Sequence, residues 1–185
     1  MGKKLVFGDV MIGKEELQER VQQLGAQISK DYHGESILAI CILKGAVLFM
    51  SDLVRAINTE CKMDFMAVSS YGGSTKSSGV VRIIKDLDGS IEGENLLIIE
   101  DIIDSGLTLS YLKEVLQGRK PKSIRICTLL DKPERRVADI VPDYIGFTIE
   151  NKFIVGYGLD YDQKYRNLPY ISYLEEVEDG EEDDE

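Results

Sequence analysis

Short runs of apolar and β-branched residues recur along the chain, and amphipathic segments separate them. The runs at residues 36–43, 95–100 and 123–130 read SILAICIL, NLLIIE and SIRICTLL. Such continuous runs are typical of strands that are buried on both faces of a sheet. Residues 14–30 and 107–120 carry apolar side chains at helical spacing, which predicts helices. Because strands alternate with helices, the sequence favours an α/β fold with a mostly parallel central sheet flanked by helices.

The other predicted elements complete one domain. We expect a further helix at residues 46–57 and further strands at residues 64–70, 80–86, 143–149 and 153–159. A chain of 185 residues suits a single well-buried domain. We predict that residues 1–174 form this domain and that residues 175–185 form a disordered acidic tail.

The net charge of −11 is concentrated at the C-terminus. Residues 175–185, EEVEDGEEDDE, contain nine acids and no lysine or arginine, so the rest of the chain carries only −2. A dense block of like charges repels itself and normally stays unstructured. Neither part offers the broad basic surface that drives nucleic-acid binding. We therefore expect no nucleic-acid partner.

The cysteines and the N-terminus indicate a cytoplasmic protein. Cys41, Cys61 and Cys127 are widely spaced and odd in number, which argues against a disulfide framework or a zinc site. The start, MGKKLVFGDVMIG, reaches Asp9 after an apolar run too short for a signal peptide. No stretch approaches the roughly 18 apolar residues of a membrane span, so we expect no membrane partner.

The stretch LLIIEDIIDSGLTL, residues 96–109, places acidic side chains at the end of a predicted buried strand. Glu100, Asp101 and Asp104 have no basic residue among them. Unpaired carboxylates are costly to bury. In an open parallel sheet, ligands bind where the loops leave the carboxyl ends of the strands. We therefore expect these acids at the rim of the sheet rather than in its core.

The turn DSGLT, residues 104–108, precedes a predicted helix. Free amides and the positive end of the helix dipole make such a turn an anion site, although an ordinary N-cap is the alternative. Glu100 and Asp101 would repel a phosphate, since two charges about 4 Å apart interact by roughly 4 kcal/mol at an effective dielectric of 20. Their natural partners are sugar hydroxyls or a magnesium ion carried by the phosphates. The combination predicts a site for a ribose 5-phosphate.

Four other segments fit either a structural or a functional role. Lys44 and Gly45 stand where a strand turns into a helix. SSYGGSTKSSG, residues 69–79, is either a hairpin connection or a lid that excludes water. Lys132 follows a strand and precedes a proline, as in many turns. The aromatic segment at residues 151–170 is either a packed edge or a surface on which a flat base stacks.

Two other kinds of site fit the sequence poorly. GDVMIGKE, residues 8–15, has the spacing of a nucleotide-binding P-loop, but Glu15 replaces the required serine or threonine. The sole histidine, His33, lies at a predicted helix end, so a Ser-His-Asp triad is hard to build.

The stretch LLIIEDIIDSGLTL resembles the signature of the type I phosphoribosyltransferases. FGDVMIGKEEL near the start and KYRNLPYI near the end are similar to the hypoxanthine-guanine branch of that family. Asp104 matches the acid of the 6-oxopurine enzymes, where adenine and orotate enzymes and the related RNA-binding regulators have uncharged residues. The resemblance covers the chain except the acidic tail. It implies the type I phosphoribosyltransferase fold, with a small hood and a flexible lid loop.

The resemblance implies how phosphoribosyl pyrophosphate (PRPP) binds. Residues 104–108 would hold its 5-phosphate, namely Asp104, Ser105, Gly106, Leu107 and Thr108. Glu100 and Asp101 would bind the ribose and Mg2+, and Asp160 would serve a second magnesium. Lys44, Gly45 and Arg166 would contact the pyrophosphate, with a cis peptide before the lysine.

The resemblance also implies how the purine is recognised. Asp104 would face N7 and act as the general acid and base. Lys132 would donate to O6, Phe153 would stack on the base, and Ile154 would read the base edge through its backbone, with Asp160 beside them. Ser70 and Tyr71 would ride on the lid.

These roles imply a purine-salvage transferase that makes IMP or GMP from hypoxanthine or guanine, PRPP and Mg2+. The alternatives are a sister enzyme that prefers xanthine and guanine, an RNA-binding regulator that senses nucleotides on the same fold, and a scaffolding protein with a vestigial site. Relatives form dimers or tetramers, so we expect a homo-oligomer.

Overall fold

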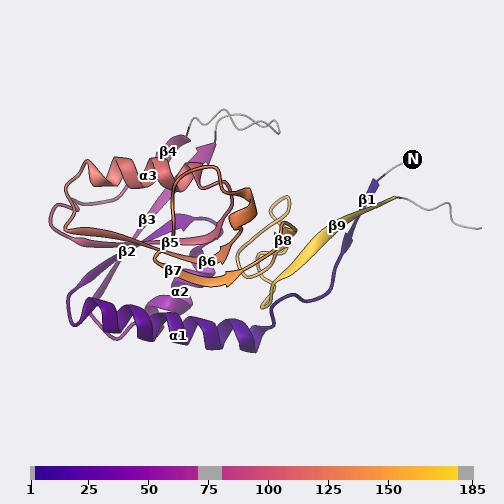
Figure 1. The fold of residues 1–185 in the computed structure, drawn as a ribbon, viewed down its shortest axis with the longest axis horizontal. Coiled ribbons are helices and arrows are strands. Elements are labelled where there is room, and N and C mark those ends of the chain that lie inside the picture. The colour runs from indigo at the N-terminus through magenta and orange to yellow at the C-terminus, as the bar shows by residue number, and fades with distance from the viewer. Residues whose placement is uncertain (1–2, 71–80, 179–185) are drawn as a thin grey trace, which may run out of the picture.

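A six-stranded sheet forms the centre of the computed structural model, which describes residues 3–70 and 81–178 (Figure 1). The strand order is β4-β3-β2-β5-β6-β7, and β4 alone runs antiparallel to its neighbour. This confirms the mostly parallel sheet predicted from the sequence. The strands are β2 (Ile37–Leu43), β3 (Cys61–Ser70), β4 (Val81–Lys85), β5 (Asn95–Ile103), β6 (Ser123–Asp131) and β7 (Tyr144–Thr148).

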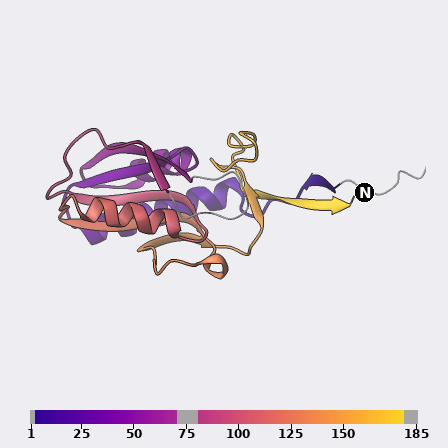
Figure 2. The ribbon, with the colours of Figure 1, turned by 90° about the horizontal axis from the view of Figure 1, so that it is seen from above.

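Helices cover both faces of this sheet (Figures 1 and 2). On one face lie α1 (Lys14–Tyr32) and α2 (Val47–Ala56), and on the other lies α3 (Leu107–Gln117). Alternate residues of β2 divide between the two cores: Ala39 and Cys41 pack with α1 and α2, whereas Leu38 and Ile40 pack with α3. This division is why β2, ILAICIL, is apolar along its whole length.

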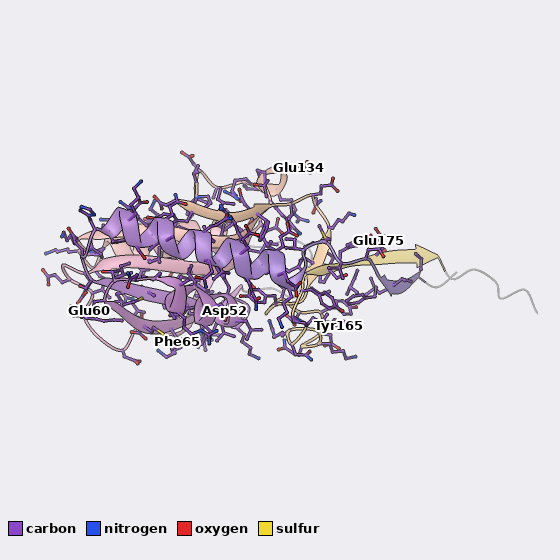
Figure 3. All side chains as sticks on the ribbon, turned by 90° about the horizontal axis from the view of Figure 1, so that it is seen from below. Asp52, Glu60, Phe65, Glu134, Tyr165 and Glu175 are labelled. Atoms are coloured by element: carbon purple, nitrogen blue, oxygen red, sulfur yellow. The ribbon has the colours of Figure 1, made fainter. Side chains whose placement is uncertain are left out.

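A second, three-stranded antiparallel sheet lies beyond the end of the main sheet (Figure 1). It consists of β1 (Lys3–Phe7), β9 (Ser172–Glu178) and β8 (Phe153–Val155). Tyr165 packs on Phe7 of β1 with ring centroids 5.6 Å apart, which joins the loop after β8 to this sheet (Figure 3). The position of this small sheet matches the hood that the resemblance implies.

The prediction that the disordered acidic tail begins at residue 175 is wrong for residues 175–178. β9 continues to Glu178, whose backbone pairs with that of Lys3 at the far end of β1. Pairing with β1 satisfies the backbone of this segment despite its charge. Residues 179–185 lie outside the described part of the chain.

The helix ends also bear on the sequence predictions. His33 is the left-handed C-cap of α1, as its predicted place at a helix end suggests, and its amide donates to the Ser29 carbonyl at 3.2 Å. None of the helices in the described ranges combines the length and apolarity that crossing a bilayer requires.

Candidate active site

Three segments meet at the carboxyl end of β2. The Leu43–Lys44 peptide bond is cis, as the resemblance implies. At Gly45 an added Cβ would lie 1.6 Å from Oδ2 of Asp101, and at Gly158 an added Cβ would lie 2.0 Å from the Gly45 carbonyl oxygen. The backbone at Gly45 therefore contacts the Asp101 carboxylate of β5 on one side and the loop after β8 on the other.

The acidic pair is more buried than predicted. β5 runs to Ile103, so Glu100 and Asp101 lie inside the strand rather than after it, and Glu100 is only 9% exposed. The predicted rim position is therefore wrong for Glu100, because sheet pairing with β6 continues past it. Burial, and then the charge of Asp101, raises the pKa of Glu100 well above its usual value. Burial also raises the pKa of Asp101 to about 6, and the charge of Arg166 opposes this shift.

The DSGLT turn forms the N-terminus of α3. Gly106 is the N-cap at φ 77°, and it has no side chain to accept hydrogen bonds from the first-turn amides. Ser105, Gly106 and Thr108 line a cavity of about 200 Å³ together with the acidic pair. The amides are unsatisfied by the helix itself and are suited to an anion.

A larger cavity of about 620 Å³ adjoins the first and shares Asp101, Ile102 and Asp104 with it. Lys132 lies in its wall, 7% exposed, and its ammonium donates to the Lys152 carbonyl. Burial lowers the pKa of Lys132. Phe153 is 51% exposed in the same wall and makes a T-shaped contact with Tyr161, with ring centroids 5.6 Å apart.

The backbone of β8 and the loop after it complete the larger cavity. Ile154 is 5% exposed, and its strand pairs with β9. Asp160 also lines the cavity, and its Oδ1 is 2.8 Å from the guanidinium of Arg166. Arg166 donates to the Gly158 carbonyl at 2.7 Å. The structure thus brings the predicted purine-binding and pyrophosphate-binding residues to one edge of the sheet.

Asp104 lies where the two cavities meet, and an arginine that the sequence analysis did not single out neutralises it. Arg135 Nε is 2.7 Å from Asp104 Oδ1, although this pair lacks the alignment of a hydrogen bond. The sequence analysis also missed Gln163. Its side-chain oxygen accepts a hydrogen bond from Lys44 at 3.2 Å, and its backbone amide donates to the Asp160 carboxylate at 2.8 Å. The run DKPERR could have drawn attention to Arg135, whereas Gln163 carries no sequence signal.

The carboxylates suit a metal only in part. Across residues 3–70 and 81–178, no three histidine, cysteine or acidic side chains converge as a ready metal cluster. Asp160 is paired with Arg166, whereas Glu100 and Asp101 are hydrogen-bonded neighbours with raised pKa values. Such a pair fits Mg2+, which keeps several waters and takes few protein ligands beside substrate phosphates.

The predicted lid lies mostly outside the described residues. The backbone of Ser70 ends β3 and pairs with Val81 of β4. Tyr71 falls in the range 71–80, which the structure does not describe.

The sheet, the helix N-terminus at its edge and the two joined cavities define an α/β protein with a ligand site at the carboxyl ends of parallel strands. The phosphoribosyl transferase domain family matches residues 13–162. A hypoxanthine-guanine phosphoribosyltransferase of Bacillus subtilis is 60% identical over 89% of this chain and 92% of its own length.

Solved structures agree with this match. A hypoxanthine phosphoribosyltransferase of Staphylococcus aureus has a TM-score of 0.89 at 52% identity, covering 91% of this chain and 92% of its own. A hypoxanthine phosphoribosyl transferase of Trypanosoma cruzi, studied for the role of its C-terminal region in oligomeric state and activity, has a TM-score of 0.87 at 40% identity, covering 91% and 92%. The chain belongs to the phosphoribosyltransferase family, in its hypoxanthine-guanine branch. The xanthine-preferring, RNA-binding and scaffolding alternatives are not favoured by these relatives.

Proposed function

We propose that this chain transfers the 5-phosphoribosyl group of PRPP to N9 of hypoxanthine or guanine, giving IMP or GMP and pyrophosphate for purine salvage. One observation carries most of the argument. A cavity at a helix N-terminus and a larger cavity with an exposed aromatic ring share Asp101, Ile102 and Asp104. A phosphorylated sugar in the first and a flat base in the second would meet at the shared wall.

PRPP would bind across the edge of the sheet. The amides of residues 104–108 would hold its 5-phosphate, because they lie at the positive end of α3 and the helix gives its first-turn amides no internal partner. The Leu107 amide donates to the Ser105 hydroxyl at 3.4 Å. Glu100 and Asp101 would accept hydrogen bonds from the ribose hydroxyls or bind Mg2+. Lys44, Gly45 and Arg166 would hold the pyrophosphate. Magnesium, when bound, would neutralise charge on the leaving pyrophosphate.

The purine would bind in the larger cavity. Phe153 would stack on it, and the backbone of Ile154 would contact its edge. Lys132 would donate to O6, which distinguishes a 6-oxopurine from adenine, because adenine presents a donor there. Asp104 would face N7 and exchange its proton during the reaction.

The reaction breaks the bond between the ribose anomeric carbon and pyrophosphate, and N9 of the purine forms the new bond from the opposite face. Positive charge grows on the ribose ring meanwhile. The carboxylates of the buried Glu100 and the partly buried Asp101 would stabilise that charge, since water screens them less than it screens exposed groups. Ser70 and Tyr71, on the proposed lid, would help to exclude water from the reacting groups.

We further propose that the protein acts in the cytoplasm as a homo-oligomer, either a dimer or a tetramer. The Trypanosoma cruzi relative, whose study concerns oligomeric state, supports the second part. Sedimentation-velocity measurements on the full chain would give the assembly size.

The decisive experiment for the activity is a product analysis. The full chain is incubated with PRPP, Mg2+ and, separately, hypoxanthine, guanine, xanthine and adenine, and the nucleotides are identified by chromatography and mass spectrometry. We expect IMP and GMP, little xanthine product and no AMP. Formation of AMP, or of no nucleotide at all, would overturn the proposal.

A further inference from the structure

The segment after β6 packs against the back of the DSGLT turn. It begins with the short 3-10 helix η1 (Pro133–Arg135), where Glu134 points outward into solvent (Figure 3). The chain then turns back, and the amides of Val137 and Ala138 both donate to the Ser105 carbonyl, at 2.9 and 3.0 Å. The turn that we assign to the 5-phosphate is therefore held by a second segment about 30 residues later in the chain.

Arg136 is the centre of this contact. Its Nε donates to the Asp104 carbonyl at 3.2 Å, and its Nη1 donates to the Ile140 carbonyl at 2.6 Å. Its third nitrogen, Nη2, is paired with the carboxylate of Asp131 at the end of β6. The Arg136 side chain is 15% exposed and that of Asp131 is 9% exposed. All three arms of the guanidinium thus have a partner, in a place with little access to water.

The fit of this segment to Gly106 is equally close. A Cβ added at Gly106 would lie 2.7 Å from Cγ2 of Ile140 and 2.9 Å from Cδ of Arg136. The N-cap of α3 therefore rests directly on the aliphatic part of the arginine. The position of the free amides at this helix end depends on the position of Arg136.

We infer that Arg136, fixed by Asp131, is a positioning residue that sets the 5-phosphate turn for PRPP. The inference rests on the proposed function, since it assumes that this turn holds the phosphate. Arg136 does not line either cavity and touches neither ligand; it acts through the Asp104 carbonyl and the Gly106 backbone. A lysine cannot replace it, because an ammonium lacks the planar fork that reaches three acceptors in different directions.

The test compares PRPP binding with purine use in Arg136→Lys. The dissociation constant of Mg-PRPP is measured by titration calorimetry without purine, and the KM values of PRPP and hypoxanthine are measured by initial rates. We expect the Kd and KM for PRPP to rise about tenfold, as for loss of a group that orients binding residues. The KM for hypoxanthine should stay unchanged. A general loss of stability would not separate the two substrates in this way.

Two further variants keep the test decisive. Asp131→Asn keeps the size of the side chain but removes the charge that anchors Arg136, so we expect a smaller rise in the same PRPP constants. Arg125→Lys is the matched control. Arg125 is a partly buried arginine on β6, the strand that ends at Asp131, and it pairs with Asp31 at 3.5 Å. It lies six residues from Asp131, or about 20 Å along the strand. It should leave both KM values unchanged.

The outcomes separate this inference from the proposed function. An unchanged PRPP Kd in folded Arg136→Lys, checked by thermal unfolding, would overturn the inference, as would equal rises in both KM values. Should Arg136→Lys not fold, an unchanged PRPP Kd in Asp131→Asn would overturn it. Absence of nucleotide product from the wild-type chain would instead overturn the proposed function, because PRPP binding is measured without turnover.

Discussion

A single methyl group at Gly45 would test how strongly the site depends on close approach of the backbone. In Gly45→Ala, the new Cβ would lie 1.6 Å from Asp101 Oδ2, whereas real Cβ contacts essentially never fall below 3.0 Å, so the two must separate by about 1.4 Å. The carboxylate is held on its other side, because Oδ1 accepts from the Ile102 amide at 2.8 Å. Turning it away would break that bond and remove it from the proposed ribose and Mg2+ position.

The expected loss follows from this displacement. Moving a binding group by about 1 Å typically costs about a hundredfold in rate, or roughly 2.7 kcal/mol of transition-state stabilisation. We therefore expect kcat/KM for PRPP, at saturating hypoxanthine, to fall about a hundredfold. The melting temperature should change little. Gly89→Ala is the control, because nothing lies within 4 Å of its added Cβ. A folded Gly45→Ala protein with wild-type kcat/KM would refute the reasoning.

Three other predictions address the acid and base, the purine contact and pH. Asp104→Asn should lower kcat by about a hundredfold or more, as loss of a general acid and base does, while calorimetry shows unchanged Mg-PRPP binding; unchanged turnover would remove Asp104 from that role. Lys132→Gln should raise the KM for hypoxanthine about tenfold, since a charge-assisted hydrogen bond contributes about 1.5–3 kcal/mol, and an equal rise for PRPP would count against a purine contact. Burial raises the pKa of Asp101 from 3.8 to about 6. Between pH 3.8 and about 6 the folded chain therefore keeps a proton that the unfolded chain releases, so stability to urea should fall as the pH rises through this range. Mg-PRPP affinity should change in the opposite sense, weakening about tenfold per pH unit below 6 as the proton competes with the cation; affinity that is flat from pH 5 to 7 would contradict this.

Local pattern was enough to predict the main sheet and its helices. The strands β2, β5 and β6 are covered on both faces, so each contains a continuous apolar run that stands out from its surroundings. In the small sheet only β8 falls within a strand predicted from local pattern, because β1 and β9 have no such mark. β1 pairs with β9 from opposite ends of the chain, and β9, SYLEEVE, runs into what reads as a charged tail. Pairing over this separation is a tertiary effect that a local pattern cannot show.

Site residues could be predicted where the chemical type of the side chain indicates a role. They could not be predicted where the backbone conformation brings the residue into the site. The acids and Lys132 could be chosen by type and by their place at predicted strand ends, whereas Arg166, seven residues past the predicted strand at 153–159, was assigned through the family resemblance. The loop after β8 could not, because Tyr157, Gln163 and Tyr165 adopt positive φ angles of 47°, 62° and 75°. Side chains of these types rarely adopt such angles, so neither this path nor the resulting contact of Gln163 with Lys44 follows from the sequence.

One expectation within the site was wrong, namely the rim position of Glu100. It considered only the free energy that burying an unpaired carboxylate costs when no ligand is bound. A buried carboxylate without a cation is unfavourable, and the raised pKa values of Glu100 and Asp101 express that cost. If the pair binds the ribose or Mg2+ as we propose, its limited contact with water would make that attraction stronger than at an open edge. Arg135 and Arg166 meanwhile neutralise the outer acids, Asp104 and Asp160. Within the described residues the inner pair makes no salt bridge, and sheet pairing holds it in place for the ligand that we propose.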